Sequence, residues 1–217
     1  MPSSHPYQLN DIVELIRLVD PKTMLDVGVG FGKYGFLARE YLELWDGREQ
    51  YGQRTRRIDG IEAFPQYILP HHRLIYDHLY VGDALAILPT LELRYDLITA
   101  VDILEHFDYE NGMKFLQACC ERAHTVVIST PFYVGAQGAS HGNPYQTHRF
   151  QWERRHFRHF PHRCFVAHDS NLIVCLGDNA PRIRRELRYG RLWPRLRRCF
   201  PFLVTVMLVL KGRLWRR

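Results

Sequence analysis

The sequence predicts an α/β fold in which helices cover both faces of a mostly parallel sheet. Short runs rich in apolar and β-branched residues alternate along the chain with segments of helical periodicity, which is the order expected of parallel strands joined by helices. The strand runs show no polar alternation, so both of their faces should be buried. A glycine-rich turn directly follows the first run, at the sheet edge where such folds bind ligands.

Each element follows from a local pattern. Apolar residues at 12, 15, 16 and 19 predict a helix that Pro21 ends. Strands are expected at 23–27, 58–61, 79–81, 95–101 and 125–129, with helices at 34–44 and 109–122 and a broken helix punctuated by Pro65 and Pro70. After Pro131 we expect a glycine-rich loop, a short helix near Trp152, and strands at 165–174 and 202–210 separated by a basic segment, 180–199.

Length and composition predict one domain over residues 1–217: an N-terminal helix (1–20), a core (21–132), and a region with a loop, the last strands and the basic segment (133–217). An apolar fraction of 46% and a charged fraction of 24% exclude a disordered chain or a small disulfide scaffold. The five cysteines form no CxxC pair, and residues 1–10 do not resemble a signal peptide. The longest apolar run, Phe202–Leu210, is too short for a transmembrane segment. We therefore expect a cytoplasmic protein.

The positive charge is concentrated at the C-terminal end. The net charge is +6, but residues 181–217 contain twelve Lys or Arg and one acid, Glu186, so the rest of the chain is acidic. This distribution predicts an anionic partner such as nucleic acid, an acidic glycan or a lipid surface, the last through peripheral contact. The alternative is a segment whose apolar face packs on the sheet while its arginines are solvated. Pro194 predicts two short helices here rather than one.

Glycines occupy positions 28, 30 and 32 in the turn after the first strand. Lys33 excludes the dinucleotide pattern GxGxxG, and Val27 and Tyr34 exclude a phosphate-binding P-loop. The remaining pattern, hhDxGxGxG, resembles motif I of the class I S-adenosylmethionine (SAM) dependent methyltransferases.

This resemblance implies a Rossmann-like sheet of seven strands whose last strand is antiparallel, SAM as the cofactor, and an enzyme. The implied cofactor-binding residues are Asp26, Gly28, Gly30, Phe31 and Gly32 in the turn, Glu62 with Ala63 for the ribose, Asp83 and Ala84 for the adenine, and Asp102. Because 36 positions separate Asp26 from Glu62, where about 20 is usual, Asp59 is the alternative ribose ligand.

A second signal is the sequence Val101-Asp-Ile-Leu-Glu-His106, in which the polar residues should share one helical face at the same sheet edge. It resembles the LEH stretch of small-molecule O-methyltransferases and the ExxEH motif of small-RNA 3′-terminal 2′-O-methyltransferases. The second resemblance implies a Mg²⁺ or Mn²⁺ site made by Asp102, Glu105, His106 and the distant His148. It departs from that motif at Asp102, which replaces Glu, and at Gln151, which replaces an acid. Without a metal, His106 or His148 would act as the general base.

These signals predict a SAM-dependent methyltransferase that methylates an oxygen of a small-molecule or glycan acceptor. The catalytic candidates are Glu105, His106 and His148, and the acceptor should lie between the N-terminal helix, residues 102–106 and the loop 132–148. One alternative is metal-assisted RNA 2′-O-methylation, with the basic segment on phosphates. The other is a SAM-binding or partner-binding module without catalysis.

Overall fold

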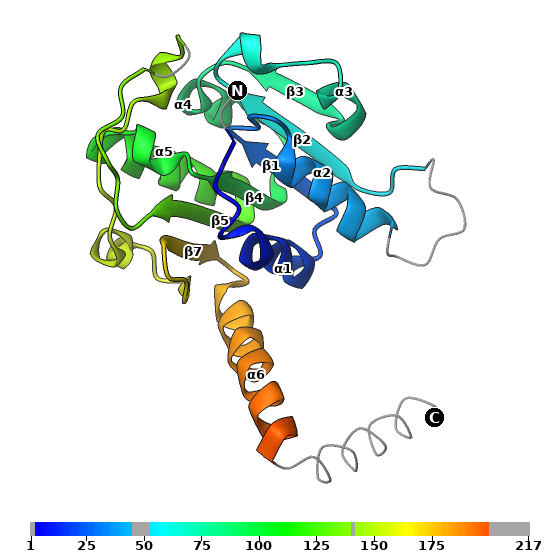
Figure 1. Ribbon diagram of the computed structural model, residues 1–217. Coiled ribbons are helices and arrows are strands. Elements are labelled where there is room, and N and C mark those ends of the chain that lie inside the picture. Colours follow the sequence, from blue (N-terminus) through cyan, green and yellow to red (C-terminus); the bar gives the residue numbers. More distant parts are fainter. Residues whose placement is uncertain (1–2, 45–52, 140–141, 200–217) are drawn as a thin grey trace.

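The computed structural model of the protein describes residues 3–44, 53–139 and 142–199, with side chains as far as residue 189 (Figure 1). It contains a seven-stranded sheet with the order β3-β2-β1-β4-β5-β7-β6. The strands are β1 (Thr23–Val27), β2 (Arg57–Glu62), β3 (His78–Val81), β4 (Tyr95–Val101), β5 (Ala123–Pro131), β6 (Arg163–Val166) and β7 (Asn171–Gly177). The expected α/β fold is confirmed, and the five expected strands before residue 132 are all present.

Helices cover both faces of the sheet because the strand side chains alternate between two apolar layers. Leu25 and Ile98 point into one layer and Met24 and Leu97 into the other. The first layer is closed by α4 (Ala84–Ile87) and α5 (Tyr109–Arg122), and the second by α1 (Leu9–Val19), α2 (Lys33–Arg39) and α3 (His72–Ile75). The binding edge is thus built on a sheet buried from both sides.

The last part of the sheet is an antiparallel hairpin of β6 and β7, and β7 is also antiparallel to β5. The expectation of an antiparallel last strand is confirmed, but the single strand predicted at 165–174 is wrong. A turn divides it, because the His168 ring accepts hydrogen bonds from the backbone N–H groups of Ser170 and Asn171 at 3.2 and 3.0 Å. The strand predicted at Phe202–Leu210 lies outside the described residues.

The basic segment forms one helix, α6 (Ala180–Cys199), which leaves the body of the protein (Figure 1). The prediction of two short helices is wrong, since Pro194 removes one backbone donor and the remaining helical hydrogen bonds suffice. Ala180 and Ile183 in its first turns are buried against the sheet. No helix in the described ranges is both long enough and apolar enough to cross a membrane.

The packing of α5 makes a stability test possible. A Cβ added at Gly112 would lie 2.1 Å from Cζ2 of the fully buried Trp152, whereas one added at Gly138 would meet nothing within 4 Å. We expect Gly112→Ala to lower the free energy of unfolding by about 2 kcal/mol. Overpacking should destabilise the protein by about 3 kcal/mol, whereas the higher helix propensity of alanine should stabilise it by about 1 kcal/mol. Urea unfolding measures it, with Gly138→Ala as the control. Equal stabilities of the two variants would contradict this packing.

Candidate active site

A cavity of about 680 Å³ opens at the carboxyl edge of the parallel strands. Twelve of the thirteen site residues expected from the sequence line it. They are Asp26, Gly28, Gly30, Phe31, Glu62, Ala63, Asp83, Ala84, Asp102, Glu105, His106 and His148. The exception is Gly32, which forms the N-cap of α2 and whose amide donates to the Val29 carbonyl at 2.7 Å.

The glycine turn after β1 lets the backbone approach the cavity closely. Gly28, Gly30 and Gly32 have φ angles of 76°, 52° and 86°, the left-handed region that favours glycine. The Gly28 amide donates to the Ile61 carbonyl at 2.8 Å, which fixes the turn to the end of β2. A Cβ at Gly28 would lie 2.1 Å from Cδ1 of Ile103, so this position has no room for a side chain.

Glu62 is the acid at the end of β2 that faces the cavity. Its carboxylate accepts the Gly30 and Phe64 amides, each at 3.0 Å, and burial raises its pKa. The alternative residue, Asp59, does not line the cavity. Instead its carboxylate accepts from the Tyr95 hydroxyl at 2.6 Å and from Arg57 Nε at 2.7 Å. The geometry therefore favours Glu62 for a ligand with paired hydroxyls, because each carboxylate oxygen keeps a free lone pair.

Two further acids, Asp26 and Asp83, line the cavity. Asp26 accepts hydrogen bonds from the Tyr76 hydroxyl at 2.6 Å and the Thr99 hydroxyl at 2.9 Å, and burial raises its pKa to about 6. Asp83 caps α4 by accepting the Leu85 amide at 2.8 Å. Both residues are thus fixed by their neighbours before any ligand binds.

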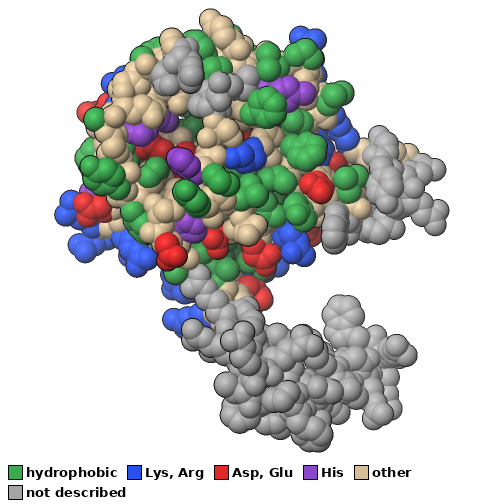
Figure 2. All heavy atoms as spheres, viewed as in Figure 1, with side chains coloured by type: hydrophobic (Ala, Val, Ile, Leu, Met, Phe, Trp, Pro, Cys, Tyr) green, Lys and Arg blue, Asp and Glu red, His purple; other side chains and the backbone are tan. Residues whose placement is uncertain are grey.

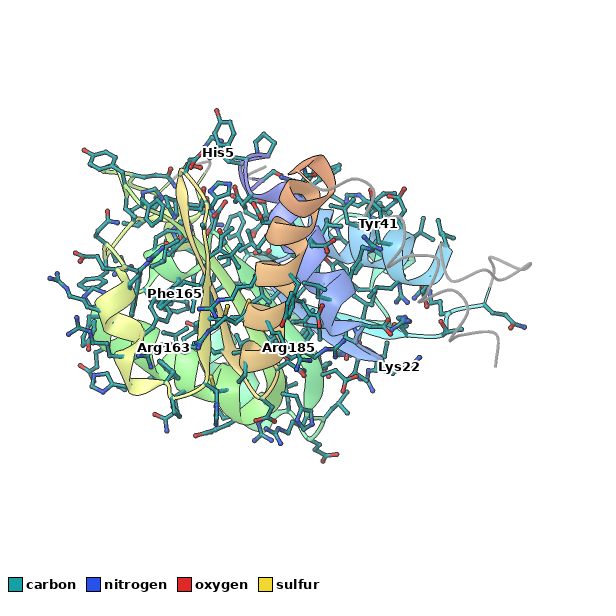
Figure 3. All side chains as sticks on the ribbon, turned by 90° about the horizontal axis from the view of Figure 1, so that it is seen from below. His5, Lys22, Tyr41, Arg163, Phe165 and Arg185 are labelled. Atoms are coloured by element: carbon teal, nitrogen blue, oxygen red, sulfur yellow. The ribbon has the colours of Figure 1, made fainter. Side chains whose placement is uncertain are left out.

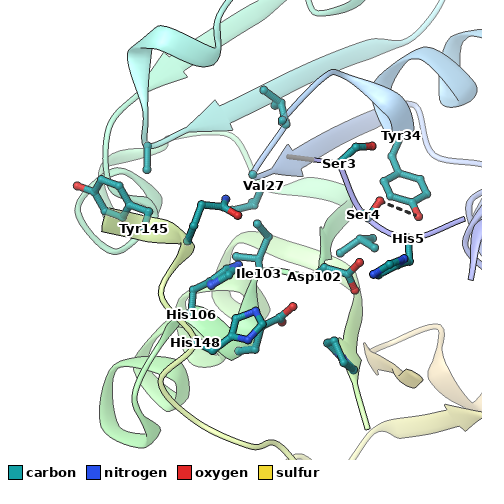
Figure 4. Close-up of a pocket in the computed structure, with 18 of the residues that line it drawn as sticks. Ser3, Ser4, His5, Val27, Tyr34, Asp102, Ile103, His106, Tyr145 and His148 are labelled. Atoms are coloured by element: carbon teal, nitrogen blue, oxygen red, sulfur yellow. Dashed lines mark hydrogen bonds between the residues drawn. The ribbon is translucent and has the colours of Figure 1, made fainter. Parts of the chain in front are cut away.

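On the other side of the cavity, Glu105, His106 and His148 come together, with one potential ligand atom from each lying within 4.8 Å of the others. The two imidazole centroids are 5.2 Å apart, and Figure 4 shows the rings side by side. His148 reaches this place because its loop is tied to the turn after β4. The Arg149 amide donates to the Glu105 carbonyl, and Trp152 Nε1 donates to the Leu104 carbonyl, each at 2.8 Å.

The hydrogen bonds and burial of this cluster show which of its atoms can meet a ligand. Nδ1 of His148 and of His106 donate to the carbonyls of Gly135 and Thr147 at 2.7 and 3.2 Å, so Nε2 is the ring nitrogen that each side chain can offer to a ligand. Burial lowers the pKa of His106 to about 4 and raises that of Glu105 to about 8. Oε2 of Glu105 is buried without a hydrogen-bond partner. Two imidazole nitrogens and an unpartnered carboxyl oxygen are a donor set that fits a divalent cation, which would displace the carboxyl proton on binding.

Asp102 lies apart from this cluster, so the structure does not bring together the four metal ligands expected from the sequence. Its φ of 56° and the single 3₁₀ turn Leu104–His106 that follows replace the expected helical face. The side chain instead accepts hydrogen bonds from Gln8 at 2.8 Å and Asn171 at 3.3 Å. Figure 4 shows Asp102 beside His5, on the side of the cavity away from His148.

Several residues that line the cavity could not be recognised as site residues from the sequence. The N-terminal residues Ser3, Ser4, His5 and Tyr7 line the cavity, and Nζ of Lys33 donates to the hydroxyl of Ser4 at 3.2 Å. These residues are polar and follow no period, so only the tertiary contacts reveal them. Asn171 had a weak signal, as an amide side chain at the start of an otherwise apolar strand.

No protein-family model and no curated protein matches the chain. Several solved structures match the chain in fold. The N-terminal domain of EvdMO1, solved with SAH and D-fucose, matches at 13% identity over 81% of this chain and 84% of that one, with a TM-score of 0.54. The methyltransferase domain of a bacterial Hen1 (CtHen1) matches at 16% identity over 79% and 98%, TM-score 0.51. Magnesium protoporphyrin IX methyltransferase from Synechocystis PCC 6803, with bound SAM, matches at 11% identity over 79% and 78%, TM-score 0.51.

The chain therefore has the fold of the class I SAM-dependent methyltransferases, as the sequence motifs predicted. The seven strands and the antiparallel β7 agree with that expectation.

The buried carboxyl of Glu105 predicts a pH-dependent stability. Its pKa is raised from 4.5 to about 8. The folded protein therefore keeps a proton that the unfolded chain loses, and stability falls as pH rises through this window. Between about pH 4.5 and 8, the free energy of unfolding of the unsubstituted protein should fall relative to that of Glu105→Gln, both without metal. The expected change in this difference is about 1.4 kcal/mol per pH unit. Urea unfolding in chelator at several pH values measures this. Glu110→Gln, at an exposed site, is the control, and parallel stability curves for Glu105→Gln and the unsubstituted protein would contradict the expectation.

Proposed function

We propose that the protein is a SAM-dependent methyltransferase that methylates a hydroxyl oxygen. The observation that carries the proposal is that one cavity joins the glycine turn and Glu62 on one side to Glu105, His106 and His148 on the other. A cofactor held at the first side and an acceptor held at the second would meet inside it. Structures with bound SAM or SAH among the similar folds support this choice of cofactor.

The cofactor side fits SAM. Gly28 and Gly30 leave space along the backbone, the two carboxylate oxygens of Glu62 would accept the ribose hydroxyls, and Asp83 would contact the adenine. When bound, SAM supplies a methyl group activated by its sulfonium. The protein's part is to orient the two reactants and to exclude water from the cavity.

The acceptor side fits a hydroxyl that must lose its proton. A divalent cation, Mg²⁺ or Mn²⁺, held by Glu105, His106 and His148 would act as a Lewis acid and lower the pKa of that hydroxyl. In the absence of metal, Nε2 of His148 has the lone pair needed to accept the proton.

The rim of the cavity suits a ring-containing small molecule or a glycan. Exposed aromatic side chains line it, and they are Tyr7, Phe31, Phe132, Tyr133 and Tyr145. Flat apolar rings stack on such side chains. A second candidate, 2′-O-methylation of RNA, is favoured by the Glu-His-His cluster, because these residues are three of the four that the resemblance to the small-RNA 2′-O-methyltransferases implies as metal ligands.

Calorimetry with SAM and NAD tests the cofactor. We expect SAM to bind and NAD not to, and we expect Glu62→Gln to raise the Kd for SAM at least about 10-fold, since a hydrogen bond to a charged group contributes about 1.5–3 kcal/mol. Glu92→Gln, at an exposed site outside the cavity, is the matched control. Binding of NAD without binding of SAM would refute the proposal.

The cluster should matter for turnover more than for cofactor affinity. We expect His148→Ala and Glu105→Ala to bind SAM nearly normally and to lose about 10²–10⁴-fold in methyl transfer. Transfer is measured with labelled SAM on a panel of polyols, glycans and short RNAs, and His159→Ala, an exposed histidine outside the cavity, is the control.

A chelator arm of the same assay separates the two forms of the mechanism. Loss of transfer in excess chelator, restored by Mg²⁺ or Mn²⁺, supports the cation. Full transfer in chelator leaves His148 as the base. SAM binding with no transfer to any acceptor class would support the non-catalytic module instead.

A further inference from the structure

Two adjacent histidines hold the tip of the glycine turn from the side away from the cavity. His72 begins the short helix α3 and His71 precedes it, and neither lines the cavity. Nε2 of His72 lies 2.8 Å from the carbonyl oxygen of Gly30, and Nε2 of His71 lies 3.1 Å from that of Phe31. Because a carbonyl oxygen only accepts hydrogen bonds, each of these ring nitrogens is the donor. Two consecutive imidazoles therefore bind two consecutive carbonyls of the turn.

The ring of His72 is itself fixed by its neighbours. The side chain is fully buried, and its Nδ1 accepts the Leu69 amide at 3.0 Å. The rings of His71 and Tyr76 contact it, with centroids 4.2 and 6.2 Å away. The position of His72 is thus set by α3 and the residues before it, and it does not depend on a bound ligand.

The hydrogen bond from His72 sets the orientation of the peptide group between Gly30 and Phe31. Among the described residues no peptide bond is cis, and in a trans peptide group the carbonyl and the N–H point in opposite directions. The carbonyl of Gly30 points to His72, which lies away from the cavity. The N–H of Phe31 therefore points to the other side, where Gly30 and Phe31 line the cavity, and offers a backbone donor to a ligand there.

The same residue of the turn also contacts Glu62. The Gly30 amide donates to the Glu62 carboxylate at 3.0 Å, while the Gly30 carbonyl accepts from His72. Both backbone groups of Gly30 are thus bonded, one to the acid that faces the cavity and the other to the buried imidazole. A change at His72 would therefore reach Glu62 through a single residue.

The fold alone does not require an imidazole at this position. The amides of Gly28 and Gly32 already fix the turn through other backbone carbonyls. Figure 2 shows hydrophobic side chains at the surface over α2 and α3, and Phe36 and Leu74 are exposed there. Burying an imidazole in apolar surroundings is unfavourable unless its nitrogens are hydrogen-bonded, whereas an aliphatic side chain would pack without that cost. The bond to the turn is therefore what distinguishes His72 from a packing residue.

We propose that His72 is a positioning residue for the cofactor. It holds the Gly30 carbonyl away from the cavity, so that the N–H of Phe31 and the carboxylate of Glu62 meet the cofactor in a fixed arrangement. The inference rests on the proposed function, because it concerns the cofactor side of the same cavity. His72 touches no reactant and acts only through Gly30.

Three substitutions of His72 separate hydrogen bonding from packing. The amide of glutamine reaches the position of Nε2 and can donate to Gly30, the shorter asparagine reaches only the position of Nδ1, and leucine fills the space without a donor. We expect His72→Gln to bind SAM within about threefold of the unsubstituted chain, because the bond to Gly30 is kept. We expect His72→Asn and His72→Leu to raise the Kd about 10-fold, the effect of one hydrogen bond. Calorimetry measures each Kd.

Two control variants should bind SAM as the unsubstituted chain does. His124→Asn makes the same change at a half-buried histidine, at the end of the strands opposite the cavity. Figure 3 labels Lys22 at that end and His5 at the cavity end. Leu176→Val lowers stability by removing a buried methylene far from the turn, so it controls for destabilisation alone. Circular dichroism confirms that each variant is folded.

Amide hydrogen exchange of the ligand-free chain measures the turn itself. We expect faster exchange over residues 28–34 in His72→Asn and His72→Leu than in His72→Gln, and unchanged exchange over residues 171–177. Equal Kd values for the three His72 variants, or unchanged exchange over residues 28–34, would overturn the proposal. Failure of the unsubstituted chain to bind SAM would instead refute the proposed function. The exchange measurement needs no cofactor, so it would still show whether His72 holds the turn.

Discussion

The glycine turn after β1 is the constraint on which the rest of the site depends. Its left-handed residues allow the chain to bend away from the sheet, and its amides are held by Ile61 and Glu62 at the end of β2. The space left by the missing side chain at Gly28 is filled by Ile103. Because Ile103 lies two residues before Glu105, the same contact that shapes the cofactor side also sets the position of the acceptor side.

The second feature of the cavity is the buried carboxyl group of Glu105, which has an oxygen without a hydrogen-bond donor. Glu105 is 2% exposed and its Oε2 has no partner, although the loop carrying His148 is tied firmly to the same turn by Arg149 and Trp152. Leaving a polar atom unpaired costs about 1–3 kcal/mol, a cost that a purely structural role would not explain. Perturbed groups of this kind concentrate where ligands and substrates bind. An unpaired buried carboxyl oxygen beside two imidazoles thus supports the proposal that the cluster binds a ligand, at a cost to the stability of the free protein.

Local patterns predicted most of the fold. The strand 95–101 and the helix 109–122 matched the structure because apolar periodicity and an N-cap at Asp108 mark them directly. The position of Asp102 could not be predicted, since its backbone has a left-handed φ that no glycine or asparagine signals, and its carboxylate contacts Gln8 and Asn171, far away in sequence. The hairpin of β6 and β7 was missed because the turn depends on a side chain, His168, rather than on glycine or proline.

The register of β7 separates the cavity from the basic residue of the edge strand, Arg163. Asn171 pairs with Pro131 at the cavity edge, whereas Gly177 pairs with Thr125 at the opposite edge, and α6 begins just after it. Arg163 pairs with Leu176, so it too lies at the far edge. On β7, Leu176 is five residues beyond Asn171. At about 3.4 Å per residue, the distance between the two pairings is longer than an arginine side chain. Arg163 is therefore too distant to hold an acidic acceptor in the cavity, so the recognition of an acceptor depends on residues at the carboxyl edge of the sheet.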